Sequence, residues 1–106
     1  MNTPNCTEKT IQLLGQLQPY FNGMGDPVRQ QIIGLLIDKE SLNVTQIAEH
    51  IPMSRPTVSH HLKVLRQAGL LQAQKKGTEL YYRLDFQDAI ELLKQLVLFV
   101  EEECLT

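Results

Sequence analysis

The stretch that decides the fold is SRPTVSHHLKVLRQAGLL, residues 54–71, because it contains the start, the period and the stop of one helix. Ser54 is a favourable N-cap, and Gly69 is a residue type that commonly ends a helix in the left-handed conformation. At about 100° per residue, three apolar side chains between them fall on one narrow stripe. The residues of this stripe are Val58, Leu62 and Leu65. The segment therefore predicts an amphipathic helix that runs to about Ala68.

The outward face of this helix carries hydroxyl, imidazole and cationic groups and no acid. Its members are Arg55, Thr57, Ser59, His60 and Lys63. Such a face suits the major groove of DNA, where Arg and hydroxyl groups read base edges and Lys meets phosphate. A solvated polar face is the alternative for these residues taken alone. His61 lies about 100° around the helix from His60, on the flank of the core, so the two imidazoles are poorly placed to share one metal ion.

The segments on either side complete a winged helix-turn-helix pattern. Upstream, Asn43 and Gln46 form a capping-box pair at the start of a short helix, and PMS (52–54) is a tight turn into the helix above. Downstream, LLQAQKKGTELYYRLD (70–85) alternates apolar and polar residues around a KKGT turn, which predicts a β-hairpin with a basic tip.

Three further helices are predicted in the flanking segments. One spans Thr7 to Leu17 and is broken or kinked at Pro19. A second begins at Pro27, after the N-cap Asp26, and runs to about Lys39. The last covers 86–103, with an apolar stripe at helical spacing. The predicted fold class is mainly α with a small β-hairpin, in the order α-α-α-α-β-β-α, as a single domain over residues 1–106.

Charge is unevenly distributed along the 106 residues, although the net charge is only −2. Residues 52–84 carry six basic and one acidic side chain, whereas residues 85–106 carry one basic and six acidic. A local positive field attracts phosphate whatever the total charge, although blocks of this size also arise by chance. No apolar run approaches the roughly 20 residues of a membrane span, and no signal pattern opens the chain. The expected location is the cytoplasm, with no membrane partner.

With these segments, the chain resembles the ArsR/SmtB family of bacterial winged-helix repressors. The similarity rests on GDPVRQQIIGLL (25–36), SRPTVSHHLKVLRQAGLL (54–71) and KKGTELYYRL (75–84). The resemblance implies a homodimer through the first and last helices, bound to double-stranded DNA at a palindromic operator and released by a signal. Family DNA contacts carry over onto Ser54, Arg55, Thr57, Ser59, His60 and His61 in the helix, and onto Lys75, Lys76 and Thr78 at the wing tip. Pro56 departs from the small polar residue that is common there.

The two usual metal sites of such repressors lack their ligands in this sequence. In the third-helix site, Asn43 and Thr45 stand where the family has cysteines, and soft metals need thiolates. In the last-helix site the matching positions are Phe86, Asp88, Leu98 and Glu101, which offer no imidazole for zinc. We therefore expect no metal at either site and no cofactor. The third histidine, His50, is expected to be a capping or surface residue.

Cys6 and Cys104 are the only cysteines, and they fall at the outer ends of the first and last helices. Two distant thiols in a reducing cytosol are usually free, and this is the default expectation. A redox switch is the alternative, because in the family's dimer these helices pack together, and some relatives sense oxidants or sulfur species through such a pair. A metal site that uses these thiols is a third possibility. Glu101, Glu102 and Glu103 would raise the pKa of the Cys104 thiol.

Three other functions compete with a repressor. The acidic, apolar last helix would suit a winged-helix adaptor that binds protein and not DNA, and a metal sensor with an atypical site is a second alternative. An enzyme is not expected, because the sequence has no Gly-rich phosphate loop and no nucleophile elbow. Asp85 and Asp88 form a carboxylate pair, but at a helix N-terminus acids stabilise the helix dipole.

Overall fold

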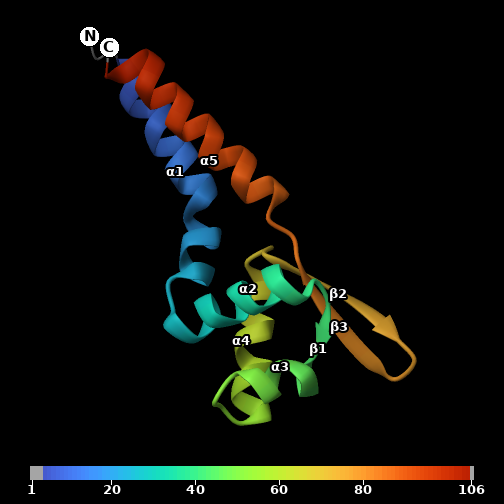
Figure 1. Cartoon of the computed structure of the whole chain (residues 1–106). Coiled ribbons are helices and arrows are strands. Elements are labelled where there is room, and N and C mark those ends of the chain that lie inside the picture. The colour runs from blue at the N-terminus through green and yellow to red at the C-terminus, as the bar shows by residue number, and fades with distance from the viewer. Residues whose placement is uncertain (1–3, 106) are drawn as a thin grey trace.

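The computed structural model describes residues 4–105 and divides into a body and a stalk (Figure 1). The elements are α1 (Pro4–Met24), α2 (Pro27–Lys39), β1 (Leu42–Asn43), α3 (Val44–His50), α4 (Arg55–Gln67), β2 (Leu71–Lys76), β3 (Glu79–Leu84), α5 (Gln87–Phe99) and the π-helix η1 (Val100–Cys104). α1 and α5 lie side by side and project from the body, which gives extents of 55 × 23 × 21 Å. The mainly helical winged fold is confirmed.

The core of the body forms around the inward stripe of α4. Val58, Leu62 and Leu65 are completely buried, as predicted, and they pack with Ile32 of α2 and Ile47 of α3. Burial of an aliphatic side chain contributes roughly 1.5–3 kcal/mol. This stripe therefore fixes which face of α4 is left for solvent.

The predicted caps of the body helices are confirmed. The Asp26 carboxylate accepts from the backbone N–H groups of Val28 and Arg29 at the start of α2. Asn43 and Gln46 form the reciprocal capping box of α3. Ser54 caps α4, which the structure ends at Gln67, and Gly69 follows with a φ of +82°.

α1 differs from its prediction, because it continues through Pro19 to Met24. A proline within a helix removes one hydrogen bond and crowds the carbonyl four residues earlier, here that of Gly15. Gly15 is exposed, so solvent can reach its freed carbonyl. Leu13 and Leu17 are buried, and this packing offsets the cost of the proline. Of the two predicted outcomes, a break or a kink at Pro19, the break was wrong, as was the end at Leu17, because that prediction weighed local chemistry alone.

The predicted hairpin is confirmed as β2 and β3, joined at Gly77 and Thr78, but it belongs to a three-stranded antiparallel sheet. The additional strand, β1, was not predicted. Its two residues pair with Tyr82 and Tyr81 of β3, so the sheet order is β1-β3-β2. The wing is therefore hydrogen-bonded to the segment that starts α3.

The last helix begins at Gln87 and changes from α to π geometry at Val100, so its C-terminal end also departs from the prediction. Only Ala89 of α5 is buried; Ile90 and Val97 of the predicted apolar stripe are exposed, and its other members are half-buried. None of the helices in the described part of the chain is both long and apolar enough to cross a bilayer.

Candidate nucleic-acid interface

The exposed face of α4 carries the residues that the helical angle predicted. Arg55, Ser59, His60 and Lys63 are all exposed, whereas Thr57 is half-buried. The Ser54 hydroxyl accepts from the Thr57 backbone N–H at 3.4 Å and donates to the Thr57 hydroxyl at 3.0 Å. These two residues therefore shape the first turn of α4.

A groove of about 250 Å³ joins α4 to the wing. Arg55 and Ser59 of α4 line it on one side, and Thr78 of the wing turn lines it on the other. Lys75 and Lys76 are exposed on the neighbouring strand, and the Lys76 ammonium lies 5.1 Å from the centre of the Tyr81 ring. The structure thus brings helix and wing candidates to one continuous surface.

Asn43 and Glu79 also line this groove, and sequence reasoning gave Glu79 no role. The Asn43 amide donates to the Glu79 carboxylate across the β1–β3 pair, while its side-chain oxygen accepts from the Gln46 backbone N–H. Asn43 is only 7% exposed, so both halves of its amide are engaged in a nearly buried site. Asn43, where the resemblance would place a metal-binding cysteine, therefore connects α3 with the wing.

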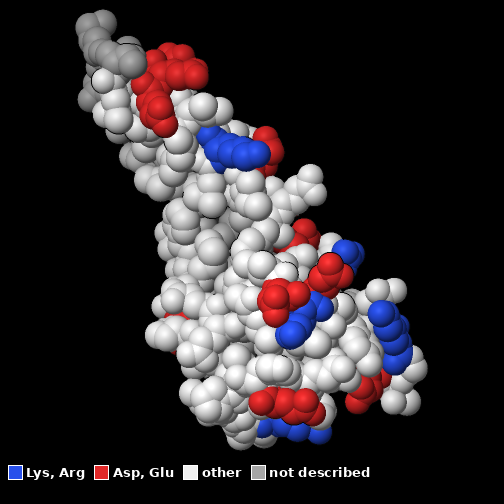
Figure 2. Space-filling model, viewed as in Figure 1, with Lys and Arg blue, Asp and Glu red and all other residues white. Residues whose placement is uncertain are grey.

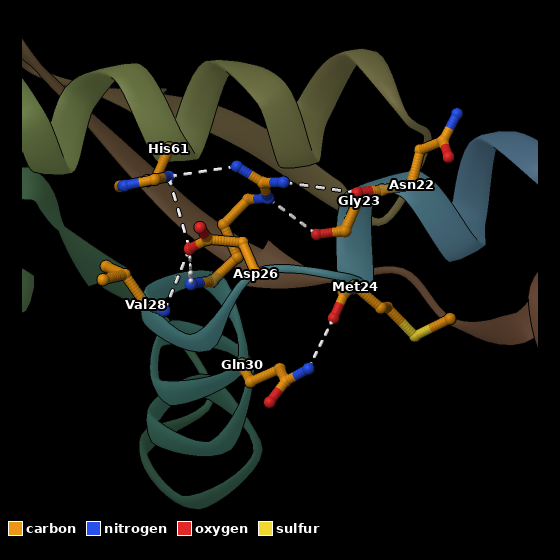
Figure 3. Close-up of polar contacts among 8 residues, drawn as sticks. Asn22, Gly23, Met24, Asp26, Val28, Gln30 and His61 are labelled. Carbon is orange, nitrogen blue, oxygen red and sulfur yellow. Dashed lines mark hydrogen bonds and ion pairs between the residues drawn. The ribbon is translucent and has the colours of Figure 1, made fainter.

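The two neighbouring histidines have different surroundings. His60 is exposed, but the His61 side chain is only 14% exposed and faces the turn between α1 and α2 (Figure 3). The His61 Nδ1 atom lies 3.2 Å from the Arg29 Nη1 atom and 3.9 Å from the Asp26 Oδ2 atom. This placement agrees with the prediction that His61 sits at the boundary of the core, and it leaves only Nε2 for any contact with DNA.

Asp26, in the turn before α2, has a lowered pKa. The backbone N–H of Arg29 donates to its carboxylate at 3.1 Å and, with the nearby charge of the Arg29 guanidinium, holds the pKa of Asp26 below the ordinary value of 3.8. Asp26 is therefore an anion at neutral pH.

The two cysteines do not follow the default expectation of free thiols. Cys6 and Cys104 form a disulfide with their Cα atoms 5.7 Å apart, inside the usual range for such a bond. Cys6 is 4% exposed, and the Thr10 hydroxyl lies 4.0 Å from the Cys104 sulfur. The disulfide connects the outer ends of the two stalk helices.

The described His, Cys, Asp and Glu side chains do not come together as a metal site. Within residues 4–105, no group of three His, Cys, Asp or Glu side chains is arranged to hold a metal ion. The His50 Nδ1 atom lies 3.0 Å from the backbone oxygen of Gln46 in its own helix, which confirms it as a surface residue at a helix end.

On the face shown in Figure 2, acidic side chains gather at the outer end of the stalk, and the body carries both acidic and basic side chains. The acidic side chains Glu101, Glu102 and Glu103 lie on η1 at the outer end of the stalk, away from the body. The acidic tail therefore does not cover α4 or the wing.

Comparisons with known proteins agree with this arrangement. Residues 26–73 match the model of the arsR family of bacterial regulatory proteins. An uncharacterized HTH-type transcriptional regulator of Methanocaldococcus jannaschii is 36% identical over 83 residues, which cover 77% of this chain and 88% of that protein. The transcriptional repressor SdpR of Bacillus subtilis is 35% identical, over 73% of this chain and 88% of that protein.

A solved structure extends the similarity to the three-dimensional fold. It is an ArsR-like transcriptional regulator from Rhodococcus sp. RHA1, with a TM-score of 0.74 and 25% identity, over 84% of this chain and 83% of that one. These relatives are regulators of transcription. The chain therefore belongs to the ArsR/SmtB family of winged-helix, DNA-binding transcriptional regulators.

Proposed function

We propose that this protein is a homodimeric repressor that places α4 in the major groove of a palindromic operator and the wing along the adjacent backbone. The observation that carries the proposal is the groove shared by Arg55, Ser59 and Thr78, which joins a helix and a wing tip in one exposed surface. In helix-turn-helix proteins the second helix reads base edges from the major groove, and side chains around it fix the register on the phosphates.

The chemistry of each side chain gives it a proposed role. Arg55 and Ser59 face the groove and are suited to base edges, because Arg can donate twice to guanine and a hydroxyl can pair with several bases. His60 and Lys63 extend the contact along α4. Ser54 and Thr57 hold the first turn, so that its backbone N–H groups meet a phosphate. Lys75, Lys76 and Thr78 contact the backbone beside the groove.

The DNA-binding proposal is tested by the fluorescence anisotropy of duplexes from the protein's own promoter region. A Lys75→Ala/Lys76→Ala protein should bind all duplexes more weakly, and in a dimer the slope of log K against log salt should fall by up to about 3 to 4. Arg55→Ala should instead relax preference at particular base pairs. Lys9→Ala/Lys39→Ala removes the same charge outside this surface and is the matched control.

The proposed dimer interface is the outer surface of the stalk. Ile11 on α1, and Val97 and Leu98 on α5, are 63%, 51% and 55% exposed. An apolar hollow lined by Leu14, Val97 and neighbouring residues runs between the two helices. Contiguous exposed apolar surface of this kind marks an interaction site, and a second copy would cover it and space two α4 helices for a palindrome.

Sedimentation provides the test of dimerisation. Val97→Glu places a charge in the apolar surface and should produce a monomer that binds the operator weakly. Gln95→Glu places the same side chain at an exposed polar position of the same helix and should remain dimeric. A Val97→Glu protein that stays dimeric would move the interface elsewhere.

We propose that the signal acts through Cys6 and Cys104. In the presence of a hydroperoxide the two thiols would lose two electrons and two protons and form the disulfide, while the oxidant is reduced to an alcohol and water. A hollow lined by both cysteines, Thr10 and Ile11 supports access for such a small molecule. Because the bond joins the outer part of α1 to η1, which continues α5, its formation would alter the helices that are proposed to form the dimer.

The signal is tested by operator affinity under defined redox conditions. Hydroperoxide should weaken operator binding by the wild-type protein, dithiothreitol should restore it, and Cys6→Ser should be insensitive to both. Equal operator affinity of the reduced and oxidised proteins would refute the proposal that the signal acts through the thiols, and it would favour an atypical metal site. Absence of affinity for any duplex would instead favour a protein-binding adaptor.

A further inference from the structure

One guanidinium connects three helices at the base of the stalk (Figure 3). The Arg29 Nε atom donates to the Gly23 carbonyl at 2.7 Å, and its Nη2 atom donates to the Asn22 carbonyl at 3.2 Å. Its Nη1 atom lies 3.2 Å from the Nδ1 atom of His61. Arg29 belongs to α2, the two carbonyls belong to the last turn of α1, and His61 belongs to α4.

The carbonyls at the end of a helix have no partner within that helix, and Arg29 satisfies two of them. A guanidinium holds several acceptors in one fixed plane, which an ammonium on a flexible stem cannot do. Arg29 therefore hydrogen-bonds to the end of α1 and also contacts α4. One side chain thus holds the direction in which α1 leaves the body. Apolar packing closes the same junction, because a Cβ on Gly23 would lie 2.9 Å from the Leu70 Cδ1 atom and 3.0 Å from the Ala68 Cβ atom.

We infer that Arg29 is a positioning residue for operator binding, and that His61 acts through it. Arg29 sets the angle between the stalk and the recognition helix α4, and His61 Nδ1 is its acceptor on α4. This inference rests on the proposed function, because the angle matters only if the stalk forms the dimer and α4 enters DNA. The DPVR segment (26–29) thereby contributes to specific binding without contacting DNA.

The protonation state of His61 decides which partner it holds. A neutral imidazole with its proton on Nε2 presents Nδ1 as an acceptor to Arg29. A protonated imidazole donates from both nitrogens and repels the guanidinium, and Asp26 Oδ2, at 3.9 Å, becomes its partner. The charged groups that face His61 are Arg29 on α2 and Asp26 in the turn, and the His60 ring lies 5.6 Å away on α4. Protonation therefore releases the α4 end of the connection.

The test compares specific with non-specific DNA affinity. At pH 8, Arg29→Lys should weaken operator binding about tenfold or more, as expected for lost hydrogen bonds to a charged group. Non-specific affinity at low salt and the sedimentation of the dimer should be unchanged, because the phosphate-facing surface is intact. Arg66→Lys makes the same exchange at an exposed position on α4 and is the matched control.

Variants at His61 test whether the two residues act as a unit. His61→Leu should lose as much operator affinity as Arg29→Lys, and the double variant should lose no more than either. His61→Asn should keep most of the operator affinity that His61→Leu loses, because its amide oxygen can accept from Arg29 in place of Nδ1.

The outcomes separate the inference from the proposed function. Multiplicative losses in the double variant, or an Arg29→Lys protein that binds the operator like the wild type, would overturn the coupling. Parallel losses of specific and non-specific affinity would show that Arg29 contacts DNA or only maintains the fold, which urea unfolding of the same variants distinguishes. A wild-type protein that binds no duplex would refute the proposed function, and this role with it.

Discussion

Reduction of the disulfide should lower the stability of the protein by a measurable amount. Cys6 and Cys104 are separated by 98 positions, so their bond closes nearly the whole chain into one loop. A cross-link removes freedom from the unfolded chain, and the chain-entropy relation gives about 4.7 kcal/mol for a loop of roughly 100 residues. Measured values often fall below this relation, so we expect reduction to lower the free energy of unfolding by about 2 to 5 kcal/mol.

Urea and thermal unfolding, with and without dithiothreitol, provide the measurement. For a chain of this size each kcal/mol corresponds to about 4 °C, so the melting temperature should fall by about 8 to 20 °C. Protomer concentration must be held constant, because association stabilises the folded state by mass action. Cys6→Ser should unfold like the reduced wild-type protein and should not respond to dithiothreitol.

Two results would refute this reasoning. Identical urea midpoints for oxidised and reduced protein would show that the bond does not constrain the unfolded chain as a long loop must. A disulfide-linked dimer on a non-reducing gel would show that the bond forms between two copies and not within one chain.

Three further outcomes follow from the packing and capping of the body. Leu62→Ala should lower the free energy of unfolding by about 2 to 5 kcal/mol, measured by urea unfolding, whereas Lys63→Ala on the exposed side should change it by less than about 0.5 kcal/mol. Asn43→Ala removes the cap of α3 and the donor to Glu79, and should cost about 0.5 to 2 kcal/mol; a midpoint equal to the wild type would deny the cap its role. The folded-state pKa of Asp26 is depressed, so its charge stabilises the fold above pH 4 and this contribution is lost as the pH falls through that folded-state value. The advantage of wild type over Asp26→Asn should therefore shrink as the pH falls below 4, and a difference that stays flat to pH 3 would contradict the assignment.

Local sequence signals predicted the body of the fold well. The start, buried stripe and stop of α4 follow from Ser54, the three-residue apolar stripe and Gly69, because caps and helical periodicity act within a few residues. The same holds for the capping box of α3 and for the β2–β3 turn. The outward positions of Arg55, Ser59 and Lys63 were predictable for the same reason.

The features that were missed depend on contacts between distant segments. β1 is only two residues long and exists because β3 lies beside it, so no pattern within residues 42–43 indicates it. α1 passes through Pro19 because Leu13 and Leu17 are buried. The contact of Arg29 with His61 spans 32 positions, and nothing at either residue alone specifies the other. The disulfide was left open for the same reason, since a sequence does not place Cα atoms.

The length of α1 has a mechanical consequence. At 1.5 Å per residue its 21 residues form an arm about 31 Å long, pivoted where Gly23 and Arg29 meet α4. A rotation of about 5° at that pivot moves the far end by about 3 Å. If two copies are joined through their α1 helices, a small displacement at the outer ends of these helices changes the spacing of the two α4 helices.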